Sequence, residues 1–326
     1  MTRTDLWRPT ASLAMIRRRA KLLQDIRDYF SQVGVLEVET PVCSHFATTD
    51  PAIQSFSTCY TGPEAARGLP LYLQTSPEFP MKRLLCAGSG PIYQICKVFR
   101  DGELGRRHNP EFTLLEWYRP GYDHHALMDE VAGLINQLSE SPLAVEKLSY
   151  REAFERQLRL NPHQADIGQL RECAIEQNVP GAGELVMEHR DAWLDLLLSH
   201  LIEPCLGESG MTFLYDYPAS QAALARVSGD PPVAQRFELY LQGVEIANGF
   251  HELDDPVEQK ARFVEDNRRR DRDKSPLMPM DEWLLDALGE GLPACAGVAM
   301  GIDRLLMALT GCEDIREVVC FDFRRA

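Results

Sequence analysis

The sequence predicts an α+β fold that combines antiparallel strand pairs with helices. Apolar residues flank a charged loop in residues 94–118 and a short turn in residues 237–253, which is the pattern of two strands joined as a hairpin. Between these hairpins, residues 122–206 carry apolar side chains at helical spacing, broken by Pro- and Gly-containing joints. We read residues 164–183 as a helical insertion on the outside of the domain.

The chain begins with a predicted helix and strand. Apolar residues recur at steps of three or four from Leu13 to Val33, and Gly34 is suited to end the helix. Residues 35–42 then alternate as a strand that stops at Pro41. Burial in the core is the simplest role for this pair.

A strand-to-helix turn follows in residues 71–88, where Ser76, Pro77 and Glu78 precede a helix expected to begin near Met81. Two roles are possible for Glu78. It can cap the helix, because acidic side chains favour the N-terminal end of the helix dipole, or it can line a ligand pocket. Further along, residues 213–218 return to strand character.

The amino-acid composition limits the classes of protein to which the chain can belong. With 44% hydrophobic and 25% charged residues in 326, the chain is typical of a soluble globular enzyme. The net charge of −15 argues against a general nucleic-acid-coating surface. The nine cysteines are scattered without a CxxC pair, so neither a disulfide framework nor a structural zinc site is expected. With no signal peptide or membrane span apparent, we expect a cytoplasmic protein.

The loop in the first hairpin is rich in positive charge. Its cationic or near-cationic side chains fall within nine positions: Arg100, Arg106, Arg107 and His108. Guanidinium groups bind phosphate or carboxylate bidentately, so a polyphosphate site is one interpretation and a solvated charged loop is the other.

The second hairpin is acidic. Its glutamates lie seven residues apart: Glu238, Glu245 and Glu252. If Gln242 and Gly243 form a two-residue turn, Tyr240 lies opposite Glu245 and Glu238 opposite Ala247. Two carboxylates would then converge on one face, an arrangement that suits Mg²⁺ shared with nucleotide phosphates. The alternative is a solvent-facing acidic edge.

Two further segments carry charge. Residues 268–274 hold four arginines and a lysine interrupted by aspartates, which favours a solvated helix end over a patch that docks a partner. Residues 295–301 read as a strand containing glycine, followed by a helix starting near Ile302. Arg304 in the first turn of that helix can reach a phosphate.

These segments occur in the order of a known family. Residues 99–112, FRDGELGRRHNPEF, resemble motif 2 of the class II aminoacyl-tRNA synthetases, in the HNPEFTLLEWY form of the lysyl subgroup. Residues 13–42 resemble motif 1, and GIDRLLM at 301–307 resembles motif 3. The resemblance implies a six- or seven-stranded antiparallel sheet flanked by helices, a homodimer, and one catalytic domain over residues 1–326 with a helical insertion at about 122–206.

The resemblance also assigns roles to residues, with ATP and Mg²⁺ as co-substrate and cofactor. The catalytic residues would be Arg100 and Arg304, which hold the ATP phosphates, and the metal would bind Glu238 and Glu245. The ATP site would comprise Arg100, Asp101, Glu103, His108, Asn109, Phe112, Glu245, Ile246, Gly301 and Arg304. The amino-acid pocket would comprise Ser76, Glu78, Glu116, Tyr118, Asn248, Glu252 and Ala299. In that pocket Glu252 would face the side-chain ammonium of lysine.

Three departures narrow the resemblance. Gly102 stands where the family usually has glutamate, with the acid displaced to Glu103, and Ala299 stands at a glycine of lysyl-tRNA synthetases. The motif 1 helix begins within about fifteen residues of Met1, so we expect no anticodon-binding β-barrel before it.

These features resemble the stand-alone paralogues of lysyl-tRNA synthetase that modify translation elongation factor P. The resemblance implies activation of (R)-β-lysine and its transfer to a lysine of that factor, with no stable tRNA binding. The alternatives are a truncated synthetase that charges tRNA and a non-catalytic regulatory paralogue.

Overall fold

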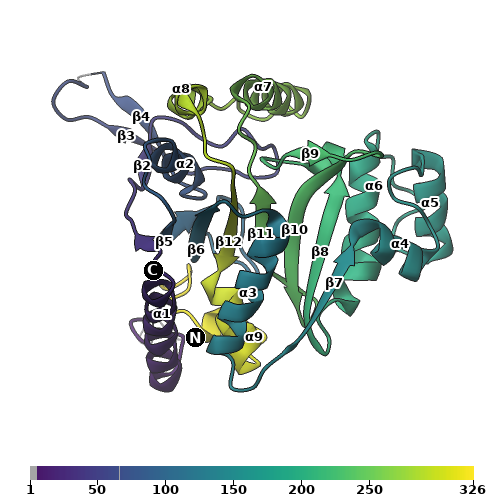
Figure 1. Ribbon diagram of the computed structural model, residues 1–326, viewed down its shortest axis with the longest axis horizontal. Helices are drawn as coiled ribbons and strands as arrows, with labels where there is room; N and C mark the ends of the chain where they lie inside the picture. The colour runs from purple at the N-terminus through teal and green to yellow at the C-terminus, as the bar shows by residue number, and fades with distance from the viewer. Residues whose placement is uncertain (1–5, 66) are drawn as a thin grey trace. The chain divides into compact units, whose positions relative to one another are not determined.

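The computed structural model describes residues 6–65 and 67–326, which form two compact units. One unit comprises the described residues up to Tyr122 together with Leu253–Ala326, and the other is Asp123–Glu252 (Figure 1). Both units combine helices with mainly antiparallel strands, while the pairs β1–β5 and β7–β8 are parallel. The predicted α+β class is therefore confirmed.

The first helix, α1 (Leu13–Gln32), forms as predicted. Ser12 caps it by accepting a hydrogen bond from the Met15 backbone, and Gly34 follows its end with a φ of +69°. Leu22, Ile26 and Phe30 are buried, whereas Leu13 is 67% exposed. The apolar stripe therefore packs against the core only along the second half of the helix.

Three strands carry the predicted loop and glycine-rich segments of this unit. They lie in the order β5 (Ile92–Phe99), β6 (Glu111–Pro120) and β12 (Cys295–Gly301), with the short β1 (Leu36–Glu37) beside β5. The strand expected over residues 35–42 is shorter than predicted. Its last ladder hydrogen bond runs from Val38 N to Tyr93 O (2.9 Å), before Pro41, which has no N–H to donate.

Strand β6 has two faces with different roles. Trp117 is buried against Phe30 of α1, with ring centroids 5.4 Å apart, so this face belongs to the core. Alternation along the strand places Glu116 and Tyr118 on the opposite face. The strand thereby presents polar groups where α1 does not cover it.

The remaining elements of the first unit are short. α2 starts three residues before the predicted position and packs against α8, which also contacts α7 (Figure 1). They are β2 (Cys43–Ser44), β3 (Ser57–Tyr60), β4 (Leu69–Leu73), α2 (Glu78–Cys86), α7 (Pro256–Arg272), α8 (Glu282–Glu290), α9 (Ile302–Thr310) and the 3₁₀ turn η5 (Ile315–Glu317). β2, β4 and β3 form a separate antiparallel sheet in that order.

The basic run at 268–274 is not a solvated helix end throughout, and this prediction is wrong for Arg270. The Arg270 side chain is 0% exposed and donates hydrogen bonds to the carbonyl oxygens of Thr49 (2.8 Å) and Asp50 (2.6 Å). Helical spacing places Arg270 on the buried face of α7 with Phe263, seven residues earlier. Its neighbours Arg268, Arg269 and Arg272 pair with Glu265 at the surface.

The second unit contains a sheet in the order β11, β10, β8 and β7, with β9 paired to β10. Helix α3 contacts β10 and β11, and α4, α5 and α6 surround a hydrophobic core that includes Phe154 and Trp193 (Figure 1). The strands are β7 (Ala144–Ser149), β8 (Gly210–Pro218), β9 (Val227–Ser228), β10 (Val233–Leu241) and β11 (Val244–His251). The helical segments are α3 (His124–Leu138), α4 (Tyr150–Leu158), α5 (Ile167–Glu176), α6 (Arg190–Leu197), the π-helical turn η2 (Leu198–Ile202) and the 3₁₀ turns η3 (Glu203–Cys205) and η4 (Ala219–Gln221).

The helical prediction for residues 122–206 holds for α3, α4, α5 and α6 but is wrong at β7. Residues 144–149 form a mostly exposed strand parallel to β8. Main-chain pairing with β8 explains this strand, because its side chains carry little apolar pattern of their own. None of the described helices is both long and apolar enough to cross a membrane.

Candidate functional site

A buried carboxyl group lies at the centre of the predicted amino-acid pocket. Glu116 is 2% exposed and accepts hydrogen bonds from the hydroxyl groups of Ser76 (2.8 Å) and Tyr118 (2.6 Å). Burial raises the pKa of Glu116 to about 7, and the nearby negative charge of Glu78 acts in the same direction. Near neutral pH this carboxyl group therefore exchanges between its neutral and charged forms.

Glu78 is held by a buried lysine. Lys82 Nζ donates to Glu78 Oε1 at 2.6 Å, and the Lys82 side chain is 1% exposed. It is Ser76 Oγ that accepts from the first backbone N–H of α2, at Glu78 N (3.0 Å). Ser76 thus satisfies the first N–H of the helix from just outside its N-cap residue, Pro77, while the carboxylate of Glu78 pairs with Lys82. The sequence reasoning missed Lys82, although its position four residues after Glu78 on a helix was a usable signal.

A cross-strand row completes this part of the pocket. Gln94 on β5 and Ala299 on β12 both lie directly opposite Glu116 on β6. Directly opposed residues project to the same face of a sheet, so Ala299 lies beside Glu116. Gln94 was not predicted. It is buried, and its Oε1 accepts no hydrogen bond from the described residues.

The charged loop meets the C-terminal helix at His108. Arg304 Nη2 lies 2.6 Å from His108 Nε2, and Arg304 Nε donates to the Arg107 carbonyl at 3.4 Å. Burial and the positive charge of Arg304 lower the pKa of His108. The imidazole is therefore neutral at pH 7, and its Nε2 can accept the hydrogen bond from Arg304.

The departure from the family pattern at Gly102 has a backbone cause. Gly102 has a φ of +83°, a conformation that side-chain-bearing L residues rarely adopt. The acid is carried instead by Glu103, whose Oε1 lies 3.7 Å from Arg100 Nη1. The guanidinium carbon of Arg100 also lies 5.1 Å from the ring centroid of Phe112. Asp101 is fixed through its backbone, because its N–H donates to the Gln54 carbonyl (2.9 Å).

The side chain of Asn109 uses both its donor and its acceptor in hydrogen bonds within the protein. Its Nδ2 donates to the Glu111 carbonyl (2.7 Å), and its Oδ1 accepts from Phe323 N (3.0 Å). Any contact of Asn109 with a nucleotide would therefore come from its main chain. Gly301, the last residue of β12, precedes the first turn of α9, which carries Arg304.

The turn of the acidic hairpin forms as predicted in the second unit. Gln242 and Gly243 have φ values of +52° and +68°, as a two-residue hairpin turn of type I′ requires. Tyr240 lies opposite Glu245, also as predicted.

The register beyond this point differs from the prediction. Glu238 pairs with Asn248 instead of Ala247, because a β-bulge adds Ile246 to β11. The bulge shifts the alternation by one residue, so Glu245 and Asn248 face the same side although they lie an odd number of residues apart. Ile246 is buried, so a nucleotide contact there would also be a main-chain contact.

Glu238 is surrounded by donors. Its Oε2 accepts from Tyr217 (2.6 Å) and Tyr240 (2.5 Å), and its Oε1 accepts from Arg236. No group of three or more His, Cys, Asp or Glu side chains in the described chain is arranged to hold a metal. The predicted pair of Glu238 and Glu245 offers two carboxylates, which fits Mg²⁺ only if substrate phosphates supply further ligands.

Glu203 joins this network and was missed by the sequence reasoning. Its Oε1 lies 3.2 Å from the Tyr240 hydroxyl, and burial together with the charges of Glu238 and Glu245 raises its pKa to about 7. It lies in η3, in a stretch without any motif. Glu252 ends the unit. It is buried, and its carbonyl accepts from Arg226 Nε (2.8 Å).

The comparisons with known proteins fit the motifs. The family described as tRNA synthetases class II (D, K and N) matches residues 2–325. The chain belongs to this family. It is 49% identical over 327 residues to a protein of Salmonella dublin named "Elongation factor P--(R)-beta-lysine ligase", with 100% of both chains covered. Proteins of the same name from Salmonella paratyphi B and Salmonella heidelberg are 48% identical over the same length and coverage.

Proposed function

We propose that this chain is an ATP-dependent ligase that activates (R)-β-lysine and attaches it to the ε-amino group of a lysine on translation elongation factor P. The observation that carries the proposal is the 49% identity, over the full length of both chains, to a protein named for this reaction. The buried Glu116 and Glu252 and the half-buried Glu78 support it, because a substrate with two amino groups needs anionic partners once it leaves water.

The reaction proceeds in two steps. A carboxylate oxygen of β-lysine attacks the α-phosphorus of ATP, the bond to the β-phosphate breaks, and pyrophosphate leaves. The ε-amino nitrogen of the acceptor lysine then attacks the carbonyl carbon of the adenylate, loses a proton and expels AMP. No protein nucleophile is needed, so catalysis rests on positioning and on stabilising charge.

The arginines position the phosphates in this scheme. Arg100 holds the α-phosphate and Arg304 the γ-phosphate, with His108 placed beside Arg304. Phe112 stacks on adenine. The remaining nucleotide contacts come from Asp101, Glu103 and the main chain of Asn109, Ile246 and Gly301. Mg²⁺, held by Glu238 and Glu245, would offset phosphate charge.

The amino-acid pocket selects the substrate. Glu78, Ser76 and the Glu116–Tyr118 pair receive the amine and carboxylate end, and Asn248 orients the substrate. Glu252 pairs with the distant ammonium. Ala299, opposite Glu116, forms a wall that favours an unsubstituted α-carbon.

Two further properties belong to the proposal. The exposed Leu13 and Leu36 in the motif 1 segment suit a homodimer interface. Nine free cysteines and the net charge of −15 suit a reducing cytoplasm and no stable tRNA binding.

ATP–pyrophosphate exchange tests the activation step directly. Exchange should depend on (R)-β-lysine and be much weaker with α-lysine. In a second assay with radiolabelled (R)-β-lysine, the label should pass to elongation factor P and not to tRNA. Labelling of tRNA that is prevented by prior oxidation of the tRNA 3′ end with periodate would instead identify a truncated synthetase. A folded protein without exchange for any lysine isomer would identify a non-catalytic paralogue.

A further inference from the structure

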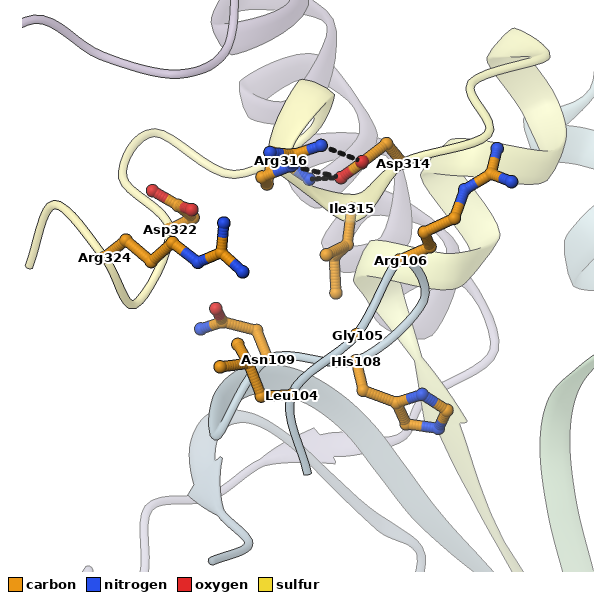
Figure 2. A pocket seen from close by; sticks show the side chains of 10 residues that line it. All are labelled: Leu104, Gly105, Arg106, His108, Asn109, Asp314, Ile315, Arg316, Asp322 and Arg324. Atoms are coloured by element: carbon orange, nitrogen blue, oxygen red, sulfur yellow. Dashed lines mark hydrogen bonds and ion pairs between the residues drawn. The ribbon is translucent and has the colours of Figure 1, made fainter. Parts of the chain in front are cut away.

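A cavity of about 310 Å³ lies between the motif 2 loop and the C-terminal segment, here residues 312–326 (Figure 2). Both walls belong to the first unit. The cavity lining includes Arg106 and Asn109 from the loop and Ile315, Arg316, Asp322 and Arg324 from the C-terminal segment. None of the roles proposed above uses the C-terminal wall.

The two walls are tied to each other by hydrogen bonds. Ile315 N donates to the Arg106 carbonyl (2.7 Å), and Phe323 N donates to Asn109 Oδ1 (3.0 Å). The imidazole of His108 points away from the cavity in Figure 2, toward the side where it meets Arg304. One loop therefore separates the cavity from the group proposed to hold the ATP γ-phosphate.

The cavity contains an arginine for which the described residues supply no partner. Arg324 makes no hydrogen bond or ion pair with the described residues, and Figure 2 shows its guanidinium between Asn109 and Arg316. The other lining arginines do have acidic partners. Arg316 Nη2 lies 2.5 Å from Asp314 Oδ2, and Arg106 Nη2 lies 2.8 Å from Glu313 Oε2. The surplus positive charge is therefore concentrated at Arg324.

A buried carboxylate lies two residues earlier. Asp322 is 6% exposed, and its Oδ1 accepts no hydrogen bond from the described chain. It also makes no ion pair with Arg324 within 4.0 Å, although both line the cavity. An ionised carboxylate that is nearly buried needs a donor, and an unpaired guanidinium needs an anion.

We propose that this cavity binds inorganic phosphate, with Arg324 and Arg316 holding its charge and Asp322 accepting a hydrogen bond from its P–OH group. Inorganic phosphate keeps a hydroxyl proton in both of its forms near neutral pH. Sulfate has none, and a phosphomonoester has largely lost its own, since its second pKa is about 6. The acceptor at Asp322 therefore distinguishes phosphate from these other anions. Because the motif 2 loop forms one wall, bound phosphate fixes that loop and strengthens ATP binding.

Calorimetry can test this site while the nucleotide site is blocked. The full-length protein is first saturated with a non-hydrolysable ATP analogue and then titrated with phosphate, sulfate or glycerol phosphate. Phosphate should bind at least about tenfold more tightly than sulfate. Glycerol phosphate should bind more tightly as the pH is lowered, because its phosphate group then regains a hydroxyl proton. Absence of phosphate binding to the saturated protein overturns the proposal, because phosphate would then compete only at the nucleotide site.

Variants assign the binding to the cavity. Arg324→Gln should weaken phosphate binding by about 10- to 100-fold. The control substitution Arg17→Gln, at an exposed position on α1, should leave phosphate binding unchanged. In Asp322→Asn the preference for phosphate over sulfate should fall toward equality. Equal phosphate affinity in Arg324→Gln and Arg17→Gln overturns the site even if Asp322→Asn fails to fold. No lysine isomer or elongation factor is needed, so this outcome is independent of the proposed reaction.

Discussion

The acidic pocket around Glu116 and the arginine loop around Arg304 hold charge in opposite ways. In the pocket, Glu116 lies between two hydroxyl donors and Glu78 is paired with Lys82. At the loop, Arg304 contacts a histidine whose pKa is lowered, and Arg100 is 3.7 Å from its nearest carboxylate.

This difference suggests how the two regions work. The pocket is organised before a substrate arrives, because buried carboxylates without donors would be costly. The loop keeps partly exposed guanidinium groups that gain strong partners when an anion binds. Changes at the loop should therefore affect chemistry with little effect on folding, and changes in the pocket should affect selectivity and stability.

Arg304→Ala should produce the largest effect. Loss of one positioned phosphate contact typically lowers a rate by about 10²- to 10³-fold, so ATP–pyrophosphate exchange should fall by that factor. The melting temperature should stay close to that of the wild type, as it should in Arg17→Ala. Unchanged exchange in the folded Arg304→Ala protein would remove Arg304 from the proposed machinery.

Ala299→Gly should change selectivity in the pocket. Ala299 lies opposite Glu116, so its methyl group takes space where the α-amino group of α-lysine would lie. Removing a methyl group from a pocket wall is worth about 10- to 200-fold in discrimination, and use of α-lysine should rise within that range. Exchange measured with both isomers on both proteins decides this. An unaltered ratio would mean that Ala299 only packs the sheet.

Glu252→Gln should weaken lysine-type substrates selectively, by about 10- to 100-fold, because the amide keeps the shape but loses the charge that compensates an ammonium. Nucleotide affinity, measured separately by calorimetry, should barely change. A parallel loss of ATP and amino-acid binding would assign Glu252 to the nucleotide site.

The pH dependence should reveal the smaller effect of Glu116. Its pKa is about 7 in the folded protein against the ordinary value of 4.5 for a glutamate carboxyl group, so the folded state binds this proton more tightly. Its contribution to the free energy of unfolding is full below about pH 4.5 and is lost as the pH rises through about 7. The free energy of unfolding, measured with denaturant, should therefore fall more steeply with pH across this window in the wild type than in Glu116→Gln. The KM for the amino acid should fall as Glu116 ionises, and identical pH profiles would contradict both statements.

The sequence allowed the hairpins to be predicted, because period-two alternation and Gln242–Gly243 turn chemistry are local signals. The roles of the site residues came from the resemblance to class II synthetase motifs and stay predictions. The bulge at Ile246 could not be predicted. The bulge inserts one unpaired residue into β11, and no residue type near it requires such an insertion.

Tertiary contacts explain the other differences. Arg270 lies in a run that reads as solvated, yet distant carbonyl groups at Thr49 and Asp50 take up its donors. Glu203 approaches Tyr240 only because the chain folds back beside β10. The hydrogen bond from Phe323 to Asn109 joins residues 214 positions apart. Such partners carry no signal in the local sequence.

The mass of elongation factor P after incubation tests the central claim most directly. With this protein, ATP and (R)-β-lysine, the factor should gain the mass of one lysyl group on a single lysine, and Arg304→Ala should leave it essentially unmodified. With α-lysine the same added mass should appear in a much smaller fraction of the factor, because the two lysine isomers have identical mass. An unchanged mass with catalytically competent wild-type protein, shown by active pyrophosphate exchange, would contradict the assignment of the acceptor.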